Sequence, residues 1–202
     1  MPSIKPYFDI HPTIGYTFTP DGSSVTVVTD IINRRAAFRK IVMDYSVAFY
    51  DVTITEAEST PEILSSKLYG SPQYHYILLL ANNIQNVYTE WPLPSATFFR
   101  YLQKKYGTDL SIIQKIDWTM DELSEIPCPV HSFYTYNGRQ IDFSTYEDQF
   151  TNNPTDTKPT YTTFYEYENT TNDAKRKIVV PRPVYISRIH NELYNLMATN
   201  SF

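Results

Sequence analysis

Two helix-start signals separated by one helix-stop signal constrain this chain more than any other feature. Thr60 is a favourable N-cap, and Pro61 fits the first helical position, where its missing N–H costs nothing. Gly70 is typical of the left-handed residue that ends a helix. Ser71 and Pro72 immediately repeat the start signal. The pattern therefore predicts two short helices joined by almost no loop.

Apolar residues inside both segments recur at helical spacing. The stripes are Ile63, Leu64, Leu68 and Tyr69 in the first segment and Tyr74, Ile77, Leu78 and Ala81 in the second. Asn82 and Asn83 can end the second helix, because Asn tolerates left-handed geometry. Residues 45–55 alternate as a strand does. We therefore expect a strand–helix–helix–strand unit that closes near residues 87–93.

The flanking sequence predicts the rest of an α+β fold. Prolines and a turn signal at Asp21–Gly22 predict an extended N-terminal segment with a hairpin. Ser95 and Gly107 bracket a third helix, while the prolines beside Cys128 favour extended structure. Further along, the sequence predicts a hairpin and an amphipathic closing helix, at residues 161–167 paired with 177–180 and at 184–198. The predicted domains are an N-terminal segment, a central module and a C-terminal region, at 1–44, 45–107 and 108–202.

Composition excludes several classes of protein. The 202 residues contain 17 Lys and Arg against 22 Asp and Glu, which argues against a dedicated nucleic-acid binder. Cys128 is the single cysteine, so neither a disulfide scaffold nor a Cys-based zinc cluster is expected. No apolar run is long enough for a transmembrane helix and no signal peptide is evident, so we expect folding in a reducing cytoplasm. The 18 tyrosines favour a large amphipathic contact surface.

Charge is segregated along the chain. Residues 34–40 are basic, residues 142–173 carry a net charge of −6, and residues 175–188 are basic again. Such a pattern suits docking between proteins, although ordinary solvated surface explains any single patch equally well.

No catalytic or cofactor site is evident. The four histidines show no metal-ligand spacing, and no glycine-rich phosphate loop is present. A Cys128 and His131 pair lacks any protease signature, so a structural cysteine is expected. We predict no catalytic residue, metal or cofactor, with an unrecognised enzyme as a minor alternative.

Four short motifs resemble a LysM module, whose strand–helix–helix–strand order matches the unit expected above. They are YDVTI at 50–54, STPEIL at 59–64, LYGS at 68–71 and ANNI at 81–84. In LysM modules a Gly-Asp-Thr type turn follows the strand. Here Glu58, Ser59 and Thr60 take its place, and the glycine is missing.

The wider sequence resembles the small LysM-containing baseplate wedge subunit of T-even-type phages with contractile tails. The matching stretches lie, in order, at residues 7–16, 30–35, 67–83, 90–93 and 172–180. The resemblance implies a structural, non-enzymatic protein of the virion tail baseplate, assembled in the host cytoplasm. Its implied partners are the wedge-core bundle proteins, a sheath-initiator-type subunit and neighbouring wedges in a sixfold-symmetric ring, without nucleic acid or membrane.

The predicted interface combines basic, aromatic and aliphatic residues, and for the apolar ones core packing is an open alternative. The candidates are Arg34, Arg35, Tyr69, Tyr74, Tyr76, Trp91, Ile186, Ile189 and Leu193. The LysM resemblance also implies an alternative function, binding of peptidoglycan as a polymer of N-acetylglucosamine. Its groove would be formed by the loops at Glu58, Ser59 and Thr60 and at Asn83 and Ile84.

Overall fold

The computed structural model describes residues 13–17, 25–29, 34–107, 114–115, 117–124 and 130–199. Helices and strands are mixed, which confirms the α+β class. Two compact units are present: unit 1 combines the residues up to Pro92 with those from Arg176 onward, and unit 2 is Leu93–Lys175. Their borders do not coincide with the predicted domain boundaries.

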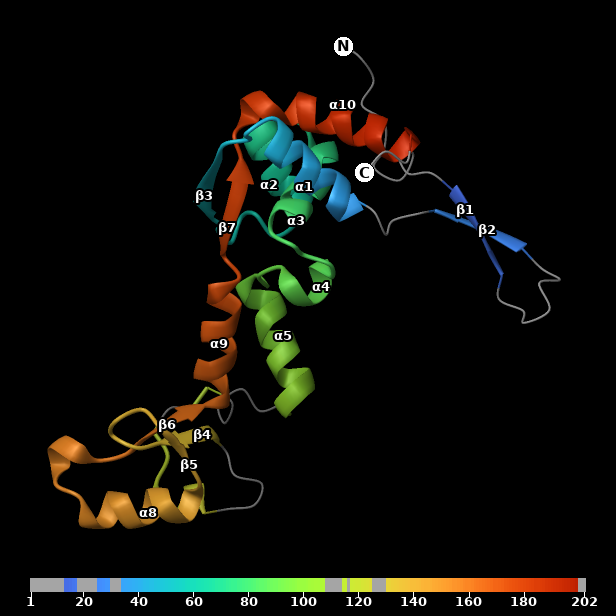
Figure 1. Ribbon diagram of the computed structural model, residues 1–202. Coiled ribbons are helices and arrows are strands. Elements are labelled where there is room, and N and C mark those ends of the chain that lie inside the picture. Colours follow the sequence, from blue (N-terminus) through green and yellow to red (C-terminus); the bar gives the residue numbers. More distant parts are fainter. Residues whose placement is uncertain are drawn as a thin grey trace. The chain divides into compact units, whose positions relative to one another are not determined.

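Unit 1 is built on a two-stranded antiparallel sheet formed by distant parts of the chain. Strand β3 (Phe49–Thr53) pairs with β7 (Lys177–Pro181), so that Tyr50 lies opposite Val180 (Figure 1). The closing strand was expected near residues 87–93, and this prediction is wrong. Helix α4 (Val87–Glu90) occupies that segment, because the Asn86 side chain caps it by accepting a hydrogen bond from the Tyr88 N–H at 3.0 Å.

The two consecutive helices are confirmed as α2 (Pro61–Tyr69) and α3 (His75–Ala81), the latter preceded by the 3₁₀ turn η2 (Pro72–Tyr74). The Thr60 hydroxyl accepts from the Ile63 N–H at 3.5 Å. Gly70 ends α2 at φ 73°, and Asn83 follows α3 at φ 58°. Thr60 therefore starts α2, and the left-handed residues Gly70 and Asn83 mark the ends of α2 and α3, as predicted.

Helices α1 (Arg34–Asp44) and α10 (Pro183–Thr199) pack together and complete unit 1 (Figure 1). Their shared core also includes α3 and consists of Ala37, Phe38, Ile41, Val47, Tyr76, Ile77, Ile186, Ile189, Leu193 and Met197. A second core lies between the sheet and α2, α3 and α4, and consists of Ile54, Leu64, Leu78, Trp91, Ile178 and Val180.

The predicted N-terminal hairpin is found as strands β1 (Thr13–Thr17) and β2 (Val25–Thr29), which pair antiparallel. No third strand joins them among the described residues. The extended stretch expected before Thr13, the turn at residues 21–22 and Cys128 lie outside the residues that the structure describes.

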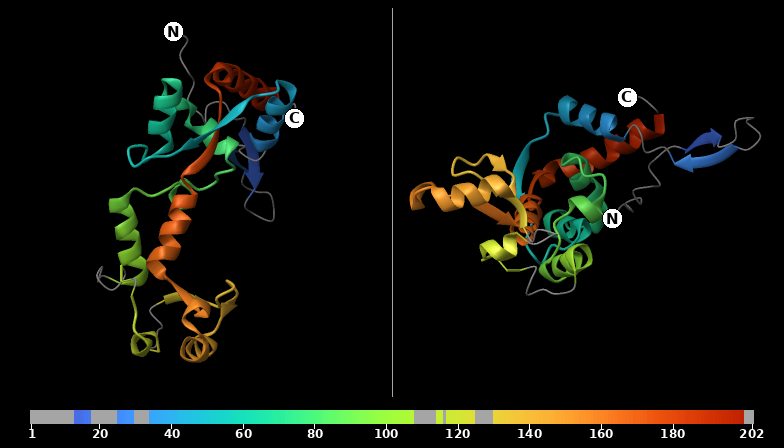
Figure 2. Two further views of the ribbon diagram at one scale, coloured as in Figure 1. Left: turned by 90° about the vertical axis from the view of Figure 1, so that its left-hand side faces the viewer. Right: turned by 90° about the horizontal axis from the view of Figure 1, so that it is seen from below.

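Unit 2 contains a three-stranded sheet and two paired helices. Strand β4 (Val130–Tyr134) lies between β5 (Gln140–Ile141) and β6 (Thr160–Thr163). Helix α8 (Phe143–Asn152) packs against this sheet, with short elements at α7 (Met120–Leu123) and η3 (Thr155–Thr157). Helices α5 (Ser95–Tyr106) and α9 (Phe164–Ala174) run side by side (Figure 2).

The predicted hairpin between residues 161–167 and 177–180 is wrong. Strand β6 pairs with β4, while β7 pairs with β3. Residues from Phe164 are helical because Thr163 and Glu166 form a capping box: Thr163 accepts from the Glu166 N–H at 3.1 Å, and Glu166 accepts from the Thr163 N–H at 2.9 Å.

Leu193 tests the packing of α10 on α1. Its side chain is fully buried, whereas Val184 on the same helix is 78% exposed. Leu193→Ala should lower the free energy of unfolding by about 2–5 kcal/mol, because it removes buried methyl groups and leaves a cavity. Val184→Ala should change it by less than about 0.5 kcal/mol. Urea titration followed by circular dichroism measures both, and equal effects would contradict this packing.

Candidate protein interface

A groove on unit 1 combines an apolar floor with basic residues at its side. It lies between α1, α3 and β3 and has a volume of about 470 Å³. Its lining residues are Arg35, Phe38, Arg39, Val42, Met43, Phe49, Leu80, Ala81 and Asn83. Long apolar and cationic side chains in one concave surface suit the docking of another protein.

The sequence of α1 places these side chains by its period. Ala37, Phe38 and Ile41 face the core, so Arg39 and Met43 project away from it. Met43, which lines the groove, is 78% exposed, an unusual position for a long apolar side chain. Methionine is flexible and polarizable, and therefore adapts to a partner surface.

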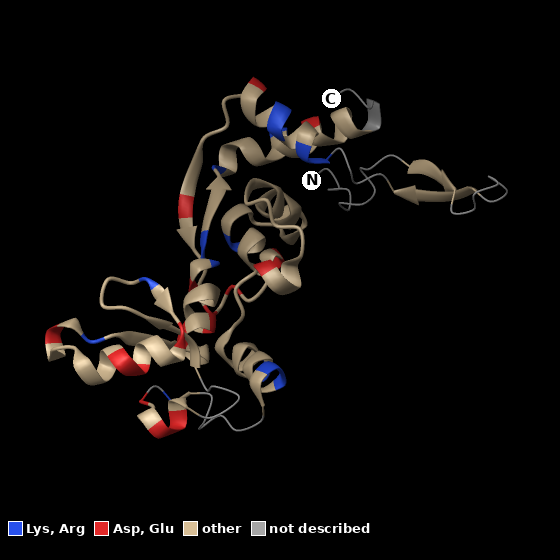
Figure 3. Ribbon diagram, turned by 60° about the horizontal axis from the view of Figure 1, so that its bottom comes forward, with Lys and Arg blue, Asp and Glu red and all other residues tan. Residues whose placement is uncertain are grey.

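The electrostatics of the groove are one-sided. Helix α1 carries Arg34, Arg35, Arg39 and Lys40 against the single acid Asp44 (Figure 3). Arg35 Nη2 donates to the Asn83 carbonyl at 3.2 Å, which ties α1 to the loop after α3. Arg39 is exposed and forms no ion pair with any residue in the described part of the chain. The Arg39 guanidinium is therefore placed to pair with a carboxylate of an acidic partner.

The predicted interface residues divide into two groups. Arg34, Arg35, Tyr69 and Tyr74 are half-buried and retain some exposed surface. Five others are buried within the chain itself, as the packing alternative expected: Tyr76, Trp91, Ile186, Ile189 and Leu193. The apolar stripe of α10 packs against α1, so Ile186, Ile189 and Leu193 are not available to a partner protein in this conformation.

Several of these aromatic residues have hydrogen-bonding roles inside unit 1. Tyr69 Oη donates to the Pro181 carbonyl at 3.0 Å, and burial raises the pKa of Tyr69. Tyr76 Oη lies 2.7 Å from His190 Nδ1. Burial lowers the pKa of His190, which favours the neutral ring that can accept this proton. These tyrosines join α2 and α3 to the C-terminal segment.

The predicted glycan-binding loops are occupied by structural interactions. Glu58 is 2% exposed and pairs with Lys67, and its carboxylate accepts from the Thr55 N–H at 2.5 Å. Hydrogen bonds from Lys67 and from Thr55 lower the pKa of Glu58 to about 2, although burial opposes them. The Glu58 carbonyl accepts from Trp91 Nε1 at 3.3 Å.

The other residues of the predicted glycan-binding loops also have structural roles or positions. Ser59 is half-buried, Thr60 caps α2, the Asn83 carbonyl accepts from Arg35, and Ile84 packs against the second core of unit 1. The geometry gives no specific support to glycan binding at these loops.

Unit 2 holds a second buried carboxylate, between α5 and α9. Glu168 accepts from Lys105 Nζ at 2.5 Å and from the hydroxyls of Tyr106 and Tyr101 at 2.6 and 3.2 Å. Burial alone would raise the pKa of Glu168, but these hydrogen bonds outweigh it and lower the pKa. Both carboxylate oxygens are engaged, which suits a structural tie between two helices.

Neither metal binding nor a membrane span is indicated by the part of the chain that the structure describes. No cluster of three or more His, Cys, Asp or Glu there could hold a metal ion. None of its helices is both long and apolar enough to cross a bilayer.

Sequence comparison assigns the chain to a family. The sequence model described as base plate wedge protein 53 matches residues 4–125, well over half of the chain. The chain belongs to this phage family. It is therefore a structural baseplate protein of the phage tail that assembles with other baseplate proteins, as the resemblance predicted at that level. A comparison with curated proteins gave no match.

Arg39 and Met43 were not among the predicted interface residues. Arg39 lies in the basic run 34–40 that the sequence analysis singled out, so its charge was a usable signal. Met43 gave none, because a methionine at helical spacing is as compatible with a core as with a surface.

The buried Glu58 predicts a specific pH dependence. Its pKa falls from 4.5 to about 2 on folding, so its contribution to stability is present above about pH 4.5 and is lost as the pH falls toward 2. The wild type should lose free energy of unfolding between about pH 5 and pH 3, and Glu58→Gln should lose less. Urea titrations across this range measure it. The control Glu147→Gln, at an exposed side chain of α8, should behave as the wild type, and equal slopes in all three would contradict the assignment.

Proposed function

We propose that this chain is a structural subunit of a contractile-tail baseplate wedge that docks onto neighbouring wedge proteins through the groove between α1 and α3. The occupant is a segment of a neighbouring protein that carries carboxylates beside apolar side chains. The observation that carries the proposal is the presence in one concave surface of exposed Met43 and of Arg39, which has no ion pair within the described part of the chain.

The chemistry of the groove favours this occupant. Burial of Met43 and Val42 under a partner removes apolar surface from water, at roughly 25 cal/mol per Å². A carboxylate that reaches Arg39 gains a charge-assisted hydrogen bond, and arginine is among the residues that dominate binding energy at interfaces. The four cations of α1 would also speed the encounter with an acidic surface.

The order β3, α2, α3, β7 in unit 1 supports a LysM-like module whose last strand follows a long insertion. In this view unit 2 is the insertion, placed between the helices and the closing strand. The module serves as a docking scaffold, and glycan binding at its loops is not required. The buried Glu58 and Trp91 hold those loops together from within the module.

Unit 2 supplies a second surface of opposite character. Leu93–Lys175 contains seven Lys and Arg against twelve Asp and Glu, so the net charge of −5 of the whole sequence arises from this range. A chain with two unlike surfaces can bind two different neighbours at once. Each weak contact then raises the effective concentration for the next, which suits a subunit that joins neighbouring wedges into a sixfold ring.

Charge reversal in the groove tests the proposal. Arg39→Glu should reduce incorporation of the chain into tail particles by about tenfold or more, because it places a carboxylate against an acidic partner. Arg100→Glu, at an exposed position of α5 outside the groove, is the matched control and should incorporate normally. Quantitative mass spectrometry of purified particles gives copy number relative to another baseplate protein.

Two results would count against the groove. Normal copy number for Arg39→Glu would remove it as a docking surface, and absence of the wild-type chain from particles would remove the structural function itself. Circular dichroism of the isolated variants establishes that both fold, since Arg39 and Arg100 are exposed.

A further inference from the structure

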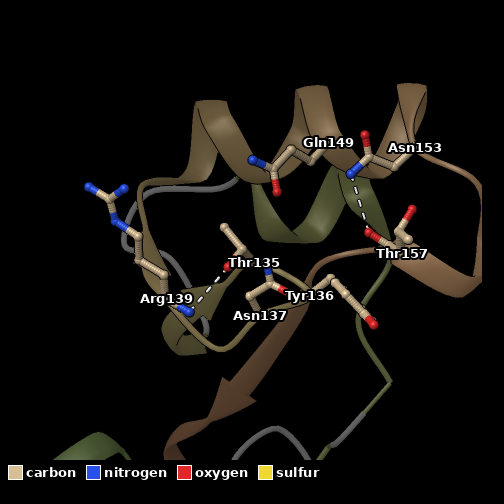
Figure 4. A pocket seen from close by; sticks show the side chains of 7 residues that line it. All are labelled: Thr135, Tyr136, Asn137, Arg139, Gln149, Asn153 and Thr157. Carbon is tan, nitrogen blue, oxygen red and sulfur yellow. Dashed lines mark hydrogen bonds between the residues drawn. The ribbon is translucent and has the colours of Figure 1, made fainter.

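A second pocket lies within unit 2 and differs in chemistry from the groove of unit 1. It has a volume of about 400 Å³ and lies between α8 and the turn that joins β4 to β5 (Figure 4). Its lining residues are Thr135, Tyr136, Asn137, Arg139, Gln149, Asn153 and Thr157. This set contains no aliphatic side chain and no carboxylate.

Three elements aim polar groups into this space. Gln149 and Asn153 project from α8 toward the turn, and they lie four residues apart on one face of the helix (Figure 4). Tyr136 and Asn137 line the space from the turn, and Thr157 lies at one end. Figure 4 shows the guanidinium of Arg139 directed away from the centre, so the middle of the pocket is uncharged.

The walls are held by the chain's own hydrogen bonds. The Thr135 N–H donates to the Arg139 carbonyl at 2.8 Å, and the Gly138 N–H donates to the Thr135 carbonyl at 2.8 Å. Gly138 adopts φ 77°, a conformation that favours glycine and fixes the turn. Asn153 Nδ2 donates to the Thr157 carbonyl at 3.2 Å and joins the end of α8 to η3. The pocket is therefore largely formed before any ligand arrives.

Its polar groups are only partly used. The side chains of Asn137, Gln149 and Tyr136 make no hydrogen bond with any residue that the structure describes, and Tyr136 is 62% exposed. Two primary amides and a phenol together offer donors and acceptors in close succession. The exposed Tyr136 ring adds a flat apolar face beside them.

This combination selects one class of ligand. An apolar ligand would find no aliphatic wall, and a polyanion would find a single cation whose charge points away from the centre. A protein segment of ordinary composition would leave its apolar side chains unmatched. A sugar ring has hydroxyl groups for the amides and C–H faces for the tyrosine. We infer that this pocket binds an uncharged saccharide, a function independent of docking through the groove.

Binding of soluble neutral oligosaccharides to the full chain tests the inference. The probes are maltotetraose and chitotetraose, and the readouts are saturation-transfer NMR and isothermal titration calorimetry. At least one probe should bind, and Tyr136→Ala and Gln149→Ala should each weaken it by about fivefold or more. Tyr88→Ala is the matched control, because Tyr88 is 90% exposed in unit 1 and lies outside the pocket.

Three results would overturn the inference. The first is no saturation transfer to either probe at millimolar concentration. The second is binding that survives both pocket variants, each shown to be folded by its thermal midpoint; such binding lies elsewhere on the chain. The third is binding of heparin alone, abolished by salt and by Arg139→Gln, which would make the pocket a polyanion site. Because Tyr136 is exposed, its alanine variant should fold even if Gln149→Ala does not.

Discussion

The pairing of β3 with β7 is the interaction on which unit 1 depends. It brings Val180 opposite Tyr50 and places α10 against α1, so helices that are far apart in the sequence share one core. Every residue of unit 2 lies in the loop that this pairing closes. Closing a long loop costs conformational entropy that only the completed sheet and core can offset. Unit 1 therefore needs its C-terminal strand and helix, although the family match ends at residue 125.

Buried carboxylates act as structural ties in both units. Glu58 links Thr55 and Lys67 through its side chain and Trp91 through its carbonyl. Glu168 gathers one lysine and two tyrosines between α5 and α9. Each charge is stable in the interior because several donors surround it, and removal of those donors would leave a costly unpaired anion. Acidic residues that are this fully engaged suit a static assembly component.

Local signals in the sequence predicted local structure where they were recognised, but the caps at Asn86 and at Thr163 with Glu166 were missed. Pairing between distant strands had no local signal to predict it. Thr60, Pro61 and Gly70 set the bounds of α2 because caps act within a few residues. No local signal identifies β7, which begins at Lys177, as the partner of β3. The sequence analysis therefore placed the partner strand nearer in the sequence, at residues 87–93. The same limit applies to the interface. The stripe at Ile186, Ile189 and Leu193 is equally suited to a core or a partner, and only the position of α1 decides.

The two units divide the binding chemistry of the chain. The groove of unit 1 joins cations to apolar surface, whereas the pocket of unit 2 offers uncharged hydrogen-bonding groups on an acidic unit. Ligands that suit one surface are poorly matched to the other, because an acidic apolar segment meets like charge at unit 2 and a sugar lacks apolar bulk for Met43. A protein neighbour and a saccharide could therefore be held at the same time without competition. Such separation lets one small subunit belong to a baseplate and still keep a free recognition surface.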